Sequence, residues 1–81
     1  MYEYKLKDML NYNIFVDTIT NIKKELNTNN LKVQVLTDSI DQVIDEFILD
    51  TIYFDSNDLF TQLKEIYYYN DEIELYISIT K

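Results

Sequence analysis

Carboxylate side chains are the residues of this sequence with the clearest capacity for chemistry. Residues 38–74 contain eleven carboxylates and one lysine, Lys64, so this window carries a net charge of −10. The acids are Asp38, Asp41, Asp45, Glu46, Asp50, Asp55, Asp58, Glu65, Asp71, Glu72 and Glu74. Residues 1–32 hold four acids and five lysines. The overall charge of −8 is therefore concentrated in the C-terminal part of the chain.

Paired carboxylates can hydrolyse glycosides, but this needs a substrate cleft, which a chain of 81 residues rarely forms. The residues that other kinds of catalytic site require are missing from the sequence. There is no histidine or cysteine for an activated nucleophile, no glycine for a phosphate-binding loop, and no arginine for a phosphoryl clamp. We therefore expect a protein that is not an enzyme.

A metal site would have to be built from oxygen ligands alone. Residues 55–58 (DSND) resemble the start of a calcium-binding loop. The match then fails, because Leu59 takes the fifth position, Phe60 the sixth, where glycine belongs, and Ile66 the twelfth, where glutamate belongs. We interpret these residues as a helix N-cap with an acidic first turn, and we expect neither a metal nor a cofactor.

Apolar residues recur with the helical period in three segments that must position these acids. The stripes are Phe15, Ile19, Ile22 and Leu26; then Ile40, Val43, Ile44, Phe47 and Ile48; then Leu59, Phe60, Leu63, Ile66 and Tyr67. Residues 27–30 end the first helix, with asparagine in place of the usual glycine. Asp38 or Ser39 is expected to cap the second helix, and Asp55 or Ser56 the third.

Strand patterns flank these helices. Residues 31–37 and 73–79 alternate between apolar and polar side chains, as in a sheet with one buried face. Residues 2–7 fit either a short strand or a helical start, and residues 51–54 either continue the second helix or form a short buried strand. If residues 51–54 form a strand, parallel neighbours are allowed. The chain has no glycine, so residues with positive φ must be asparagine or aspartate, and Asn27–Asn30 and Asn70–Asp71 are expected as tight connections.

We predict an α+β fold in one domain spanning residues 1–81. About three helices pack on one face of a small two- to four-stranded sheet, in the order (β)–α–β–α–(β)–α–β. No run of apolar residues is long enough for a membrane span, and no secretory leader is visible, so we expect a cytoplasmic protein with no membrane partner. Residues with GC-rich codons are missing, which indicates an AT-rich genome: a low-GC bacterium, or a phage or mobile element within one.

Two clusters are candidates for partner binding. Asp41 and Asp45 lie one turn apart in the predicted second helix, with Glu46 beside them, and their mutual repulsion is easier to explain if a basic partner uses them. Residues 67–69 are three consecutive tyrosines, which span about 200° of a helix. Tyr67 fits the buried stripe, so Tyr68 or Tyr69 is expected to be exposed as an interface anchor, and Tyr76 could extend that patch.

In its size, its acidic window 38–74, its AT-rich residue usage and its lack of catalytic residues, the chain resembles small acidic phage anti-defence proteins: anti-CRISPR proteins, restriction inhibitors and other DNA mimics. The resemblance implies an inhibitor that binds a basic nucleic-acid-handling protein, such as a CRISPR effector or another defence nuclease, and blocks its groove for nucleic acid. The chain itself is not expected to bind nucleic acid, given its negative charge. The partner-binding residues are expected to be Asp41, Asp45, Glu46, Asp58, Tyr68, Tyr69, Asp71, Glu72 and Glu74.

Two alternatives remain open at this point. An antitoxin or immunity protein that neutralises a basic nuclease would use the same chemistry. A structural or assembly protein would instead self-associate, as a homodimer or larger, through an exposed strand edge or through the tyrosines. DNA mimicry also requires that the fold gather the acids of the window onto one face, because along a single extended helix they would be too sparse to match the charge density of a duplex.

Overall fold

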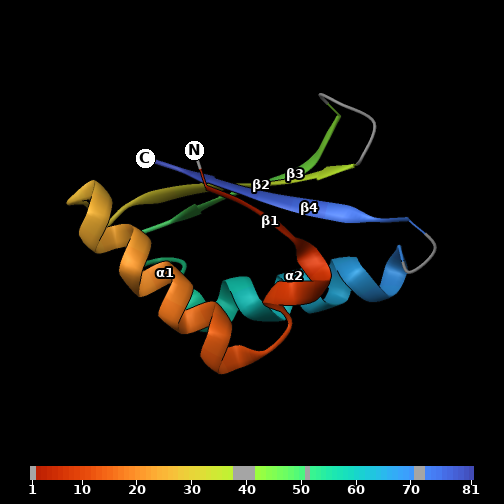
Figure 1. Cartoon of the computed structure of the whole chain (residues 1–81), viewed down its shortest axis with the longest axis horizontal. Coiled ribbons are helices and arrows are strands. Elements are labelled where there is room, and N and C mark those ends of the chain that lie inside the picture. The colour runs from red at the N-terminus through yellow and green to blue at the C-terminus, as the bar shows by residue number, and fades with distance from the viewer. Residues whose placement is uncertain (1, 38–41, 51, 71–72) are drawn as a thin grey trace.

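The computed structural model describes residues 2–37, 42–50, 52–70 and 73–81, and shows two α-helices lying on one face of a four-stranded antiparallel sheet (Figure 1). The elements are β1 (Tyr2–Lys5), the 3-10 helix η1 (Leu6–Met9), α1 (Tyr12–Leu26), β2 (Leu31–Thr37), β3 (Val43–Leu49), α2 (Ser56–Tyr69) and β4 (Leu75–Thr80). The α+β class predicted from the sequence is confirmed.

The strand order is β1-β4-β2-β3, so β4 and β2 are central and β1 and β3 form the two edges. The last strand inserts between the first and the second, and the two chain ends lie side by side (Figure 1). Val33 is opposite Ile79 on β4 and opposite Phe47 on β3, which fixes the register across the sheet. All three strand pairs are antiparallel, so the parallel neighbours allowed by the sequence do not occur among the described strands.

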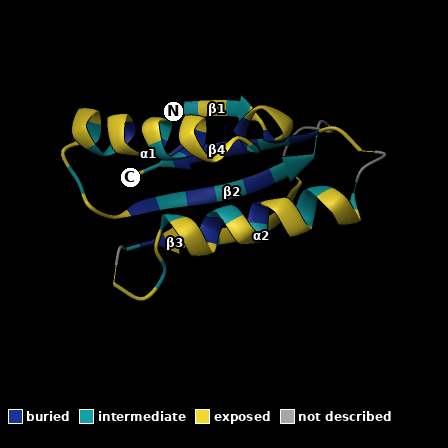
Figure 2. Ribbon diagram, turned by 90° about the horizontal axis from the view of Figure 1, so that it is seen from below, coloured by how far each residue is buried: buried dark blue, intermediate teal, exposed yellow. Residues whose placement is uncertain are grey.

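The core lies between the sheet and the helices. Alternate residues of β2 and β4 point into it, as the apolar alternation of both segments predicts, and Figure 2 shows this alternation as dark bands along β2. The sheet contributes Leu31, Val33, Val35, Leu49, Leu75, Ile77 and Ile79, and the helices contribute Leu6, Met9, Phe15, Ile19, Ile22, Leu59 and Leu63. The opposite face of the sheet carries no helix in the part of the chain that the structure describes.

Side-chain caps define the helix ends, and the ends predicted at Asn27 and Asp55 are confirmed. The Asn11 side chain accepts a hydrogen bond from the Ile14 N–H at 3.1 Å at the start of α1. Asn27 ends α1 in the left-handed conformation, with φ of 51°, and takes the place of the glycine that this chain lacks. Asp55 caps α2 as predicted, and Asn70 ends it.

The predicted second helix is wrong. Residues 43–49 form the strand β3, which pairs with β2 across a hairpin. Its apolar residues fit the helical period, but they are mostly β-branched or aromatic, and β2 requires a partner on this side to satisfy its backbone. The expected caps Asp38 and Ser39, and the residues Ile40 and Asp41, lie outside the described residues.

Three further boundaries differ from the predictions. Residues 52–54 lie in a loop, where the Asp50 N–H donates to the Phe54 carbonyl at 3.3 Å, so they are neither helix nor strand. The N-terminal strand ends at Lys5, and the 3-10 helix η1 begins at Leu6. Residues 2–7 are therefore part strand and part helix, so each of the two alternatives describes part of the segment. β4 begins at Leu75, and Ile73, the expected first inward residue, is exposed.

Candidate functional site

The edge strand β3 exposes an unusual number of apolar side chains. Val43, Ile44 and Ile48 are all exposed, and Ile48 keeps 55% of its surface in contact with solvent. A bulge between Val35 and Leu36 in the pairing of β2 with β3 accommodates the extra residue Ile44. Apolar side chains concentrated on an outer strand are typical of a contact surface for another molecule.

The two acids of β3 point to opposite faces of the sheet. Asp45 is opposite the buried Val35, which places it toward the helices, whereas Glu46 is opposite Gln34 on the uncovered face. The Gln34 side-chain amide donates to the Glu46 carboxylate at 2.8 Å. The Asp45 carboxylate accepts a hydrogen bond from the backbone N–H of Glu46 at 2.9 Å. The prediction that Asp45 and Glu46 share the polar face of a helix is therefore wrong, and Asp41, the third member of that cluster, lies outside the described residues.

The loop after β3 is organised by Asp50. Its carboxylate accepts backbone N–H groups from Ile52, Tyr53 and Phe54, at 3.1, 2.8 and 3.0 Å. These hydrogen bonds, led by the one from Tyr53, lower the pKa of the Asp50 carboxyl, because they favour its charged form. The turn leaves the side chains of Ile52 and Tyr53 exposed by 80% and 87%.

We define the β3 surface as the exposed residues of β3 and of the loop that follows it. Its members are Val43, Ile44, Asp45, Glu46, Ile48, Ile52 and Tyr53. Strand β3 itself carries two acids and no basic residue, and the cation beside it in the register is Lys32, opposite Ile48 on β2. The surface therefore combines apolar side chains with a negative charge.

The other predicted partner-binding residues are spread over the molecule. Asp58 belongs to the capping box of α2, where its carboxylate accepts the Asp55 N–H at 3.1 Å and its own N–H donates to the Asp55 carboxylate at 3.0 Å. Glu74 forms an ion pair with Lys5 at 3.1 Å, beside the opposite edge strand β1. Asp41, Asp71 and Glu72 lie outside the described residues. The described members of the acidic window are thus not gathered onto one face.

The predicted burial of Tyr67 and exposure of its neighbours at the end of α2 are confirmed. Tyr67 is partly buried and packs against the core, whereas Tyr68 and Tyr69 are exposed by 70% and 87%. Asp58 lies eleven residues before Tyr69 in α2, so about 16 Å along the helix axis separates these two predicted partner-binding residues. Tyr76 is opposite Leu36 and Lys5 on the uncovered face of the sheet, so it lies on the other side of the sheet from α2 and does not extend the exposed pair.

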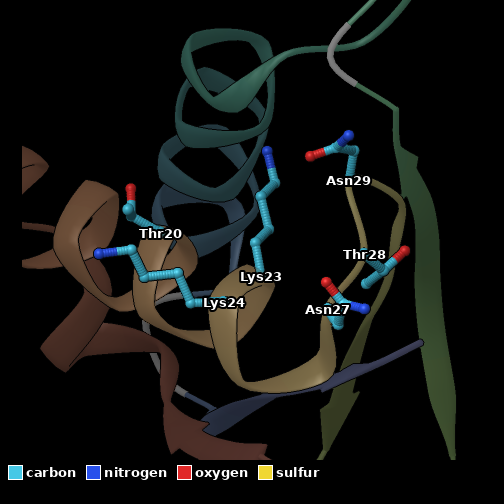
Figure 3. A pocket seen from close by; sticks show the side chains of 6 residues that line it. All are labelled: Thr20, Lys23, Lys24, Asn27, Thr28 and Asn29. Carbon is cyan, nitrogen blue, oxygen red and sulfur yellow. The ribbon is translucent and has the colours of Figure 1, made fainter.

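A depression of about 400 Å³ lies at the C-terminal end of α1 (Figure 3). It is lined by Thr20, Lys23, Lys24, Asn27, Thr28 and Asn29. In Figure 3 the ammonium groups of Lys23 and Lys24 point away from each other, so they do not converge on one point. Both lysines lie in the last turn of α1, where a cation complements the negative end of the helix dipole. The helix dipole accounts for the position of both lysines, so no ligand is needed to explain them.

Among the residues that the structure describes, no group of three or more acids is placed so that it could hold a metal ion. Within the same residues, no helix has the length and apolar content to cross a membrane. Comparison of the chain with protein-family models, with curated proteins and with solved structures found no match.

Sequence reasoning missed Ile48, Ile52 and Tyr53 as surface residues. Ile48 was assigned to a buried helical stripe, and residues 51–54 were treated as helix or buried strand. A signal was present in residues 43–49, where four of seven residues are β-branched or aromatic, a composition that favours a strand. The exposure of Ile48 follows from its place on the uncovered face of an edge strand, which no local pattern reveals.

Proposed function

We propose that this protein is a non-catalytic inhibitor that binds a basic, nucleic-acid-handling protein, such as a CRISPR effector or another defence nuclease, through the β3 surface. The observation that carries the proposal is the placement of Asp45 and Glu46 on the same edge strand as the exposed Ile44 and Ile48. Apolar contacts provide the burial that stabilises a complex, and carboxylates among them select a partner of opposite charge.

Electrostatics favours a basic partner. The chain has a net charge of −8, and the acids of β3 are exposed, so a cationic protein is attracted before contact and associates faster at low salt. A protein that handles nucleic acid offers a groove of lysine and arginine side chains, and a carboxylate placed there competes with phosphate. The inhibitor blocks the groove by occupancy and needs no catalytic group of its own.

The proposal narrows the set of acids expected from the sequence. Asp45 and Glu46 are the described acids of the β3 surface, and Asp58 is assigned to helix capping. Tyr68 and Tyr69 remain candidate anchors at the end of α2 because both rings are exposed. Asp41, Asp71, Glu72 and Glu74 remain candidates by charge alone.

The test is capture from a low-GC bacterial lysate with a charge-reversed variant, Asp45→Lys/Glu46→Lys. The matched control is Asp8→Lys/Asp17→Lys, which changes the net charge by the same amount at two exposed acids of η1 and α1. The captured protein is identified by mass spectrometry, and fluorescence anisotropy then measures whether the inhibitor displaces a labelled duplex from it. We expect the wild type and the control to capture a nucleic-acid-binding protein and to displace the duplex, and the variant to do neither.

Two results would contradict the proposal. In one, the captured protein holds the duplex and this protein simultaneously, so that occupancy blocks nothing. In the other, the Asp45→Lys/Glu46→Lys variant and the control capture the same protein equally well, which would place the contact elsewhere. An antitoxin that neutralises a basic nuclease would give the same capture, and a toxin gene beside this gene would distinguish it.

A self-associating structural protein is the second candidate, and the open edge of β3 is the observation that favours it. It predicts a stable oligomer without any external ligand. Sedimentation velocity at several protein concentrations tests it directly, and a monomer at all concentrations would exclude it.

A further inference from the structure

The pairing of β2 with β3 shows which backbone N–H and C=O groups of β3 point away from the sheet. The Thr37 N–H donates to the Gln42 carbonyl at 3.2 Å, so Thr37 directs its backbone toward the β3 side. Because backbone direction alternates along a strand, Val35 and Val33 also point toward β3, and their partners Asp45 and Phe47 point back. Glu46 and Ile48 therefore direct their N–H and C=O groups away from β2, toward solvent.

The hydrogen bond between Asp45 and Glu46 supports this assignment. The Glu46 N–H is bound by the Asp45 carboxylate at 2.9 Å, as expected for a donor that faces outward. At Ile48 the side chain is more than half exposed, and the residue lies at the same outward register. An edge with outward N–H and C=O groups is a template for one more strand.

The charges on β3 decide which strand can be added. Acids on an edge strand oppose pairing with another acidic strand. A second copy of this chain would bring its own Asp45 and Glu46 and a further net charge of −8. An extended segment that carries lysine or arginine meets no such repulsion and gains attraction from both carboxylates.

The loop after β3 provides a further contact. It extends beyond β3 on the side away from β2 (Figure 2). Ile52 and Tyr53 in this loop are the two most exposed apolar side chains near the edge, at 80% and 87%. An added strand would lie next to them and bury them, together with Ile48.

We propose that β3 accepts an extended, basic segment of the partner protein as a fifth strand of the sheet, with a cationic side chain beside Glu46 and an apolar one beside Ile48. This inference rests on the proposed function and specifies its binding mode. The Glu46 carbonyl and the N–H and C=O groups of Ile48 provide backbone hydrogen bonds, because the Glu46 N–H is already bound by the Asp45 carboxylate. The side chains on the uncovered face provide selectivity.

The probe is an eight-residue peptide, Lys-Thr-Val-Thr-Lys-Thr-Val-Thr, in which lysine and valine alternate along one face of an extended strand, as Glu46 and Ile48 do on the uncovered face of the sheet. It is titrated into the full chain and followed by NMR and by fluorescence polarisation. Its control is the same peptide with alternate backbone nitrogens methylated, which keeps the charge and removes the donors on one edge. We expect the methylated peptide to bind about tenfold more weakly, the effect of losing one or two backbone hydrogen bonds. The amide shifts caused by the unmethylated peptide are expected at Glu46 and Ile48.

A pair of variants tests the same contact from the side of the protein. Ile48→Pro removes the outward N–H, which an edge strand tolerates because that group is not used by the sheet. Ile48→Ala removes the same apolar side chain but retains the N–H. We expect Ile48→Pro to weaken binding of the lysine–valine peptide about tenfold more than Ile48→Ala, with thermal melts showing that both are folded.

Four outcomes would overturn the added strand. Equal binding of the methylated and unmethylated peptides would show that charge alone attracts them, which removes backbone pairing and leaves the proposed function standing. Amide shifts at β1 would place the contact on the other edge. Absence of binding up to millimolar peptide would exclude β3 as a template. A homodimer of the wild type that Ile48→Pro dissociates would assign the edge to a second copy. Failure of the proposed function is seen separately, in the duplex displacement assay.

Discussion

Phe47 and Phe54 stack with their rings parallel, the ring centroids 5.5 Å apart and the planes 3° from parallel. Phe47 belongs to β3 and lies opposite Val33 on the helix-covered side of the sheet, whereas Phe54 is the last loop residue before the cap of α2. The stack therefore attaches the loop of residues 52–54 to the edge strand, and holds Ile52 and Tyr53 next to β3.

The first prediction concerns this stack. Phe54→Ala is expected to lower the free energy of unfolding by about 2 kcal/mol, less than for a fully buried phenylalanine because both rings are only partly buried. Urea denaturation measures the change. The matched variant Phe54→Tyr retains a ring and is expected to remain close to the wild type. Equal losses in the two variants would show that the stacking geometry is not what stabilises the loop.

The second prediction concerns Asp50, whose pKa is lowered by the N–H groups of Tyr53, Phe54 and Ile52. A carboxyl with a depressed pKa in the folded state stabilises that state above its unfolded pKa, near the ordinary value of 3.8, and this contribution is lost as the pH falls through the folded pKa. We expect the amide resonances of residues 52–54 to titrate together with a midpoint below 3.8. NMR of the wild type between pH 2 and pH 6 measures it.

Two variants of Asp50 provide the control. Asp50→Asn retains an oxygen that accepts the same N–H groups but does not titrate in this range, so the shared midpoint is expected to disappear while the loop remains in place. Asp50→Ala removes the acceptor and is expected to release Ile52 and Tyr53 from their positions at every pH. If the three amides retained the low midpoint in Asp50→Asn, another carboxyl would be responsible.

The third prediction concerns Asn27, which ends α1 with φ of 51°. Asn27→Gly is expected to raise the free energy of unfolding by about 0.5 kcal/mol, because glycine enters the left-handed region without a steric cost, and Asn27→Ala to lower it by about 1 kcal/mol. Thermal and urea unfolding of the pair measure the difference. A stabilising alanine would show that the helix end rearranges.

These local rules explain which parts of the fold could be predicted. The stripe of α1, the asparagine cap, the alternation of β2 and β4 and the Asp55 cap all follow from short-range patterns, and the structure confirms them. β3 could not be identified in this way, because Val43, Ile44, Phe47 and Ile48 satisfy the helical period as well as a strand composition. Pairing with β2, a contact between distant backbone groups, decided in favour of the strand.

The candidate site was predictable in its chemistry but not in its geometry. The acidic character of residues 38–74 is evident in the sequence, and Asp45 and Glu46 were among the expected contacts. Their placement on opposite faces of an edge strand depends on the hairpin, and so does the exposure of Ile48. An acid that caps a helix and an acid that faces a partner look alike in a sequence, and they differ only in the groups that surround them.

The last prediction separates those two roles with Asp58 and Glu46. Asp58→Ala removes half of the capping box of α2 and is expected to lower the free energy of unfolding by about 1 kcal/mol. Glu46→Ala removes an exposed carboxylate whose bond to Gln34 is also exposed, and a change within about 0.5 kcal/mol is expected. Capture of the basic partner is expected to show the reverse order, with Glu46→Ala impaired and Asp58→Ala intact. Urea unfolding and capture, measured on the same two variants, would contradict the assignment if Asp58→Ala lost the partner while Glu46→Ala retained it.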